Sequence, residues 1–293
     1  KTFLLSEPIE NQPPFTLLIA TATSFDGLIL LGGVFIKLFL FCSSGAQHAS
    51  DIKLPKLYNL ILMIIEKNLN IPLTKDQEEK IVLFSNKIYE SNKRFNLTGL
   101  KDLNSIRDIL VNESIKSLDS INLSSNKKSL NIIDIGSGAG IPGIPLKIIN
   151  DNLRLTFVES NRKKCEFIAS TCDDLGLEVD IINDRAEIIA HKKSYREKFD
   201  LILSRGVANL STLAEITLPF AKIGGSIISI KGLNISKEII SSEHSVKLLG
   251  GDLFFYMTPT KYSSIIGWKK IYSTPEKYPR KPGTPQKHPL SLK

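Results

Sequence analysis

The chain has 293 residues, of which 42% are hydrophobic and 23% are charged. This is the composition of an ordinary globular protein with enough apolar residues for a sizeable core, and it excludes a disordered or low-complexity chain. Because the three cysteines form no C-x-x-C pair and the four histidines are scattered, the sequence predicts no metal site, no disulfide framework and a reducing compartment, the cytoplasm.

Basic charge is concentrated at the C-terminal end. The net charge is +8, and between Lys261 and Lys293 eight lysines and arginines face one acidic residue, Glu276. A concentrated basic end favours a polyanionic partner such as nucleic acid. The alternative is a tail that is merely solvated.

The first fifty residues are unlike the rest of the chain. The segment from Phe15 to Phe41 is strongly apolar, but Asp26 and Lys37 interrupt it. No charge-free stretch therefore reaches the roughly 20 residues that a bilayer span requires. We interpret residues 1–50 as an apolar appendage without an assigned role, and we expect no membrane association elsewhere.

Residues 51–123 have a helical pattern. Apolar residues recur at helix spacing between Leu54 and Ile65 and again between Ile81 and Tyr89. Thr74 and Gln77 have the spacing of a capping box that begins the second of these helices. The polar stretch from Ser124 to Ser129 indicates a linker to the next part of the chain.

From residue 124 to the end, strands and helices alternate. Strands are predicted at Ile132–Ile135, Leu153–Val158, Glu178–Ile182, Phe199–Ser204 and Ser226–Ile230. Helices are predicted at Pro142–Asn150, Arg162–Leu175, Leu210–Ala221 and Ile235–Leu249. This alternation predicts an α/β fold with a parallel sheet. Two later β-like runs, Asp252–Met257 and Ser264–Tyr272, are close enough to pair as an antiparallel edge.

The most informative motif lies between Asn131 and Pro145, where an apolar strand ends at Asp134 and glycines stand at 136, 138 and 140. Glycine permits a positive φ and allows a ligand to lie against bare backbone. A helix that begins at Pro142 offers free N–H groups to a polar ligand. A strand, a glycine turn and a helix in this order form the place where an open α/β sheet holds a nucleotide-like cofactor.

The spacing of the glycines bears on which cofactor binds. The run from Gly138 to Gly143 satisfies G-x-G-x-x-G with Glu159 as a ribose ligand, so a nicotinamide-dependent (NAD) oxidoreductase is one interpretation. Counted from the first glycine, Gly136, that fingerprint requires glycine where Ile141 stands. The D-x-G-x-G-x-G arrangement from Asp134 instead resembles the first motif of S-adenosylmethionine-dependent methyltransferases.

Further segments stand in order around this loop: Arg94–Gly99, Val158–Ile168, Arg185–Glu187, Ser204–Ala208 and Lys277–Pro285. Together they closely resemble the bacterial small-subunit (16S) ribosomal RNA guanine-N7 methyltransferase family, known also as glucose-inhibited division protein B. The resemblance covers roughly Leu54 to Leu290 and leaves out residues 1–50.

The resemblance implies a Rossmann-like class I methyltransferase sheet, mostly parallel with an antiparallel edge, behind an N-terminal helical region. It implies S-adenosyl-L-methionine as cofactor and a guanine N7 of 16S rRNA in the small ribosomal subunit as methyl acceptor. The implied cofactor-binding residues are Asp134 at the methionine end, Gly136, Gly138, Gly140 and Ile141 in the loop, Glu159 at the ribose, Ala186 and Glu187 by the adenine, and Arg205 at the cleft. The family usually has a larger aromatic residue or leucine in place of Ile141, and commonly alanine in place of Gly206.

Guanine N7 already carries an available lone pair, so methyl transfer to it needs orientation and no general base. In keeping with this, Ser204 and Arg205 stand where methyltransferases of exocyclic amines carry an Asp/Asn-Pro-Pro-aromatic motif. We predict Arg205 as the catalytic residue, which pairs with the methionine carboxylate or with an RNA phosphate. A plain surface ion pair is the alternative for Arg205.

RNA contacts are predicted for five residues: Asn96, Lys231, Tyr278, Arg280 and Lys281. Asn96 precedes a turn at Gly99, and hydrogen bonding within that turn is its alternative role. Lys231 ends a strand and is equally well explained as an exposed lysine. The last three alternate aromatic and cationic groups between prolines, which suits RNA binding, although the tail can also pack on its own domain.

A second alternative to the methyltransferase is an RNA-binding protein that keeps a degenerate methyltransferase fold without binding cofactor. The intact set of Asp134, Gly136, Glu159 and Arg205 argues against it. We expect a monomer with three parts, which are residues 1–50, residues 51–123 and a methyltransferase domain at 124–293.

Overall fold

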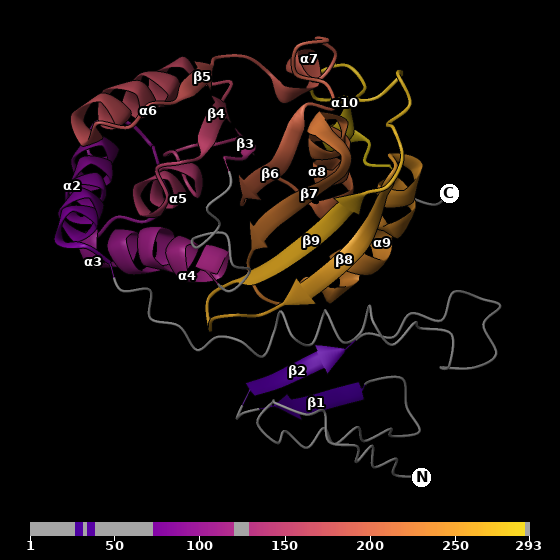
Figure 1. Ribbon diagram of the computed structural model, residues 1–293, viewed down its shortest axis with the longest axis horizontal. Helices are drawn as coiled ribbons and strands as arrows, with labels where there is room; N and C mark the ends of the chain where they lie inside the picture. The colour runs from indigo at the N-terminus through magenta and orange to yellow at the C-terminus, as the bar shows by residue number, and fades with distance from the viewer. Residues whose placement is uncertain (1–26, 32–33, 39–72, 120–128, 291–293) are drawn as a thin grey trace. The chain divides into compact units, whose positions relative to one another are not determined.

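The computed structural model describes residues 27–31, 34–38, 73–119 and 129–290 (Figure 1). The chain divides into two compact units, Lys1–Asn68 and Leu69–Lys293. In the first unit, β1 (Gly27–Leu31) and β2 (Val34–Leu38) pair as antiparallel strands inside the apolar segment. In the described part of the chain, no helix combines the length and apolarity needed to cross a membrane.

The larger unit is built on a seven-stranded sheet with the order β5-β4-β3-β6-β7-β9-β8. Its strands are β3 (Asn131–Ile135), β4 (Arg154–Val158), β5 (Asp180–Ile182), β6 (Phe199–Arg205), β7 (Ala221–Lys231), β8 (Gly251–Met257) and β9 (Ser264–Lys270). The first five of these run parallel, whereas β9 is antiparallel to both β7 and β8. The predicted mostly parallel sheet with an antiparallel edge is therefore confirmed.

Helices connect the parallel strands. They are α5 (Gly143–Ile149), α6 (Arg162–Leu175), α7 (Ala186–Ile189), α8 (Leu210–Thr217) with the 3₁₀ turn η3 (Leu218–Phe220), α9 (Ser236–Leu248) and, near the C-terminus, α10 (Thr284–Lys287). The strands β3 and β4 bury four of their five residues. Helices on both faces explain why these strands are continuous apolar runs and show no alternation.

A helical region precedes the sheet, as predicted. It comprises α2 (Lys75–Asn92), α3 (Leu103–Ser105), the π-helix η2 (Ile106–Asn112) and α4 (Glu113–Asp119). Thr74 and Gln77 form the expected capping box at the start of α2. The Gln77 amide also donates to the backbone oxygens of Ile148 and Ile149, at 3.2 and 3.3 Å, and so ties the start of α2 to the end of α5.

Several boundaries differ from the expected ones. The strand β7 begins at Ala221, five residues before the predicted start, and α8 ends at Thr217. The pairing of β6 with β7 shifts register beside Gly225, where a Cβ would lie 2.8 Å from the Lys222 oxygen. Glycine permits this bulge, and it masked the early half of the strand in the sequence pattern. The helix predicted between Leu54 and Ile65 and most of the 124–129 linker lie outside the described residues.

Candidate functional site

The glycine loop joins β3 to α5 at the carboxyl edge of the parallel strands. Gly136, Gly138 and Gly140 all have positive φ, at 69°, 58° and 79°. A Cβ on Gly136 would lie 2.9 Å from a methyl group of Val207, so the loop also packs against the segment that follows β6. This alternation of left-handed positions requires glycine, and it leaves the loop backbone bare toward a ligand.

Asp134 is the most unusual ionisable residue of this loop, because its side chain is completely buried. Its Oδ2 accepts a 2.9 Å hydrogen bond from the Gly143 N–H, while its Oδ1 has no partner among the described residues. Burial raises the pKa of Asp134 to about 7, although the Gly143 bond opposes the shift, and the nearby Glu159 carboxylate adds to it. An unpaired buried carboxylate oxygen is costly, so a positively charged ligand group would stabilise it.

Glu159 follows β4 and is fixed on the other side of the loop. Its Oε2 accepts from the Gly138 N–H at 2.9 Å, and its Oε1 accepts from the Asn161 N–H at 2.8 Å. The Asn183 side chain donates to the Glu159 backbone oxygen at 3.0 Å. The structure thus brings Asp134, the glycines and Glu159 together as predicted, and adds Asn161 and Asn183, for which the sequence offered no signal.

Ala186 and Glu187 open α7 after β5, beside the same edge. The Glu187 carboxylate is buried and accepts from Arg185 at 3.0 Å and from the Gly283 N–H at 2.9 Å. Burial opposes ionisation, but these two hydrogen bonds lower the pKa of Glu187 below its usual value. The Glu187 side chain therefore holds the C-terminal segment, which leaves the backbone of this turn as the group that can contact an adenine.

Arg205 is the last residue of β6, which ends one residue later than the predicted end at Ser204. Its guanidinium donates to the Ile109 oxygen at 2.7 Å and to Ser114 Oγ at 3.1 Å. Burial lowers its pKa, and the neighbouring Glu113 carboxylate opposes that shift. Arg205 thus holds the π-helix η2 and the start of α4 against the sheet. This role differs from both the surface ion pair and the cleft position that were considered for Arg205 from the sequence.

Glu113 extends this contact to the antiparallel edge. It is buried and accepts from Ser263 Oγ at 3.2 Å and from Thr260 Oγ1, both in the turn between β8 and β9. The strand β9 begins beside Lys231, at the end of β7, so this turn lies at the carboxyl edge of the sheet. Arg205 and Glu113 therefore join three segments that are distant in sequence, which no local pattern could indicate.

Two predicted RNA-binding residues upstream of the tail have different surroundings. Lys231 donates to the Ala208 oxygen at 2.7 Å and forms a 3.0 Å ion pair with Glu238, so its charge is compensated within the domain. The turn at Gly99 is organised by Asn92, whose Oδ1 accepts from the N–H groups of Leu97 and Thr98. Asn96 is exposed and its side chain has no partner among the described residues, so it remains available to a ligand.

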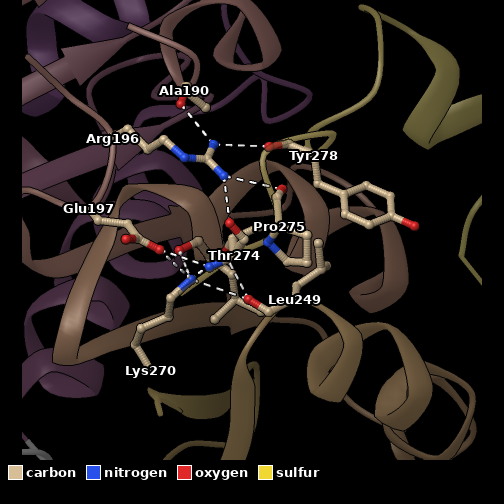
Figure 2. A network of polar contacts seen from close by, with 9 residues as sticks. Ala190, Arg196, Glu197, Leu249, Lys270, Thr274, Pro275 and Tyr278 are labelled. Carbon is tan, nitrogen blue, oxygen red and sulfur yellow. Dashed lines mark hydrogen bonds and ion pairs between the residues drawn. The ribbon is translucent and has the colours of Figure 1, made fainter. Parts of the chain in front are cut away.

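The C-terminal segment packs on its own domain. Figure 2 shows the Arg196 guanidinium donating to backbone oxygens of Thr274, Pro275 and Tyr278, with Ala190 as a fourth acceptor. Beside it, the Lys270 ammonium contacts Glu197 and two backbone oxygens, and burial lowers its pKa to about 8.

The predicted tail residues are divided by this packing. Tyr278 is 8% exposed, and Arg280 forms a bidentate pair with the fully buried Glu215, with contacts of 2.6–3.2 Å. Lys281 is exposed. Packing on the domain, the alternative reading of the tail, therefore describes Tyr278 and Arg280, while RNA contact by Lys281 stays a prediction.

We expect Arg280→Ala to destabilise the protein. The change leaves the Glu215 carboxylate buried without its cation, and breaking a buried pair on one side costs about 3–5 kcal/mol. Urea unfolding would show a lower midpoint with an unchanged slope. The neighbouring Lys281→Ala is the matched control and should shift stability by no more than about 0.5 kcal/mol. Equal effects of the two changes would contradict a stabilising role for the pair between Arg280 and Glu215.

A family model described as rRNA small subunit methyltransferase G matches residues 77–263. This chain belongs to that family. Proteins named ribosomal RNA small subunit methyltransferase G from Alkaliphilus oremlandii and Oenococcus oeni are each 37% identical to it, over 76% and 77% of this chain and 95% of their own. A protein of the same name from Clostridium botulinum is 36% identical over 80% of this chain and 99% of its own.

The family match confirms the resemblance read from the sequence motifs. The matched region of this methyltransferase G family member contains the glycine loop, Glu159 and Arg205, and it leaves residues 1–76 outside. Membership favours methyl transfer over both the oxidoreductase and the non-catalytic RNA-binding protein. Within the described residues, no group of three or more His, Cys, Asp or Glu side chains is placed to hold a metal ion.

The residues at the carboxyl edge fit S-adenosylmethionine, the cofactor of such enzymes. Asp134 Oδ1, to which no described residue donates, supplies an acceptor for a cationic group, and the left-handed glycines leave room for a ligand against the backbone. Glu159 presents a carboxylate that can exchange its amide donors for ribose hydroxyls.

Proposed function

We propose that the chain transfers a methyl group from S-adenosylmethionine to N7 of a guanine in 16S rRNA of the small ribosomal subunit. The observation that carries the proposal is the buried Asp134 Oδ1, which has no hydrogen-bond partner in the described part of the chain and lies beside a left-handed glycine loop in a member of this family. A cationic ligand group would stabilise such an oxygen, and the methionine end of S-adenosylmethionine carries one.

Four parts of the site would hold the cofactor. Asp134 takes the cationic methionine end, the backbone from Gly136 to Ile141 lies along the ligand, Glu159 takes the ribose, and the backbone at Ala186 and Glu187 meets the adenine. When bound, the cofactor supplies a methyl group on a positively charged sulfur. The remaining task of the protein is to present the guanine ring behind that methyl group.

Arg205 serves this task as a positioning residue. Because it holds η2 and α4 at the edge of the sheet, it sets one wall of the space in which the guanine must be oriented. Orientation of two reactants can be worth about 7–11 kcal/mol of the barrier. No proton has to be removed from N7, so no general base is assigned.

RNA contact is proposed for Asn96 and Lys281, whose side chains are exposed. Lys231, Tyr278 and Arg280 keep a supporting role, since the first and last are hydrogen-bonded inside the domain and the tyrosine is buried. An enzyme of this activity would act on the small subunit in the cytoplasm, as a monomer.

Arg205→Ala should lower the turnover of methylation by about 10²-fold, because a displacement of about 1 Å in the wall has that effect. The affinity for S-adenosylhomocysteine should change little, and the fold should persist. The measurement is tritium transfer from labelled cofactor to 30S particles from a strain without the endogenous enzyme. Full turnover in a folded Arg205→Ala protein would exclude the positioning role, and Arg205→Lys, which can keep one of the two hydrogen bonds, should fall between.

The proposed function itself is tested by two measurements on the unmodified chain. Calorimetry should detect binding of S-adenosylhomocysteine and none of NAD. The labelled 30S particles should then carry the methyl group at N7 of one guanine, as mapped by cleavage at the modified base. A chain that binds neither ligand, or that labels protein instead of RNA, would refute the proposal.

A further inference from the structure

A groove lies between the helices α2 and α6, outside the cofactor site. The two helices pack against one another, and a cavity of about 560 Å³ opens between them. The lining residues come from the end of α2 and the turn after it, and from one face of α6. Both helices belong to the larger unit, so the groove is built within one compact body.

The charges around this groove are unevenly compensated. Each lining carboxylate has its own cation, since Glu90 pairs with Lys93 at 2.7 Å and Glu166 pairs with Arg162 at 2.8 Å. Two lining cations are Arg94 after α2 and Lys163 on α6, and their side chains form no hydrogen bond or ion pair with any residue that the structure describes. One uncompensated positive charge therefore stands on each wall, which suits an anionic ligand.

Other lining groups suit a nucleotide more than a simple anion. Thr171 is 1% exposed, and its Oγ1 has no hydrogen-bond partner within the described part of the chain. Phe95 and Phe167 add aromatic surface, one from each side of the groove. Cations for phosphates, aromatic rings for bases and a spare hydroxyl are the combination that single-stranded RNA recognition uses.

The groove also begins at the carboxyl edge of the parallel strands, where the cofactor site lies. Lys163 lies in the first turn of α6, four residues after Glu159. Lys87 pairs with Asp174 near the other end of α6, whereas Arg94, seven residues later, lines the same cavity as Lys163. These two contacts indicate that α2 and α6 run antiparallel, with Arg94 toward the start of α6. The uncompensated cations thus mark the end of the groove that is nearer to the cofactor site.

We propose that this groove binds the phosphodiester backbone of the rRNA strand next to the target guanine, with Arg94 and Lys163 as its phosphate ligands. The inference rests on the proposed function. It also accounts for where RNA is held, given that Arg280 and Lys231 pair with carboxylates inside the domain.

The test compares the full chain with Arg94→Ala/Lys163→Ala in binding to in-vitro transcribed 16S rRNA. The control variant Lys198→Ala/Lys237→Ala removes the same charge from two exposed lysines outside the groove. We expect the groove variant to weaken RNA binding at least tenfold and to reduce the slope of log affinity against log salt by about 1–2, while the control changes both only slightly. The variant Arg94→Lys/Lys163→Ala, which restores one positive charge, should recover part of the lost RNA affinity.

S-adenosylhomocysteine binding separates the possible failures. If the unmodified chain does not bind this ligand, the proposed function fails whatever the groove does. If the chain and both variants bind it equally, but the groove variant keeps full RNA affinity, the groove proposal is overturned. An equal loss of RNA affinity in the groove and control variants would likewise overturn it, because only the overall charge would then matter.

Discussion

Alanine at position 143 should abolish cofactor binding and strongly destabilise the larger unit. Gly143 begins α5, and a Cβ there would lie 2.4 Å from Cε1 of Phe157 and 2.9 Å from Oδ2 of Asp134. The Phe157 ring is completely buried and has no room to retreat. Overpacking costs about 1–3 kcal/mol, and loss of the Gly143 bond to the buried Asp134 carboxylate adds about 1.5–3 kcal/mol.

Thermal unfolding and calorimetry with S-adenosylhomocysteine measure the two effects. Gly232→Ala is the matched control, because Gly232 is exposed after β7 and a Cβ there meets nothing within 4 Å. The control should keep both stability and binding. A Gly143→Ala protein that binds the ligand with unchanged affinity would show that the contact between Gly143 and Asp134 does not shape the site.

The elements that the sequence predicted correctly are those whose signals are local. The strand that contains Asp134, the left-handed glycines and the helix from Arg162 to Leu175 follow from hydrophobic runs and glycine conformation over a few residues. The meeting of Asp134 with Glu159 then follows from the parallel topology, because carboxyl ends of neighbouring strands share an edge. The order of the strands was not predicted and comes from the structure.

The partners of the charged residues could not be predicted in this way. Arg205 contacts Ile109 and Ser114, more than ninety residues earlier, and Arg280 contacts Glu215 at a separation of 65. Counting charge in the tail treats every cation as free, whereas folding compensates some of them and leaves others exposed. Short elements such as α7 and α10 were missed for a related reason, since one turn of helix carries too few residues for a periodic pattern.

The same difficulty affects Glu187, whose position beside the cofactor edge was predicted from the motif. The motif locates the turn after β5 but does not reveal that the side chain accepts from Gly283. A buried carboxylate takes the donors that tertiary packing brings to it, and here one of the two donors comes from a segment 96 residues later. The prediction of a site residue from sequence is thus more secure for backbone position than for side-chain role.

Asp134→Asn should make the cofactor-free protein more stable at pH 8 while abolishing binding of S-adenosylmethionine. The pKa of Asp134 is raised from 3.8 to about 7 in the folded chain, so folding favours the protonated acid. The stability that Asp134 contributes is fully present below pH 3.8, and this contribution is lost as the pH rises from there through about 7. A shift of about 3 units corresponds to roughly 4 kcal/mol.

Asparagine keeps an acceptor for the Gly143 N–H but never ionises, so it should remove this loss. Urea unfolding of both proteins at pH 5.5 and pH 8 provides the measurement: the wild-type chain should lose stability between the two, and the difference should be much smaller in the variant. Added S-adenosylmethionine should raise the midpoint of the wild-type chain alone, because only a carboxylate compensates the cationic methionine end. If Asp134→Asn is less stable than the wild-type chain at pH 8, or if S-adenosylmethionine raises both midpoints equally, the Asp134 carboxylate does not bind the cationic group of the cofactor.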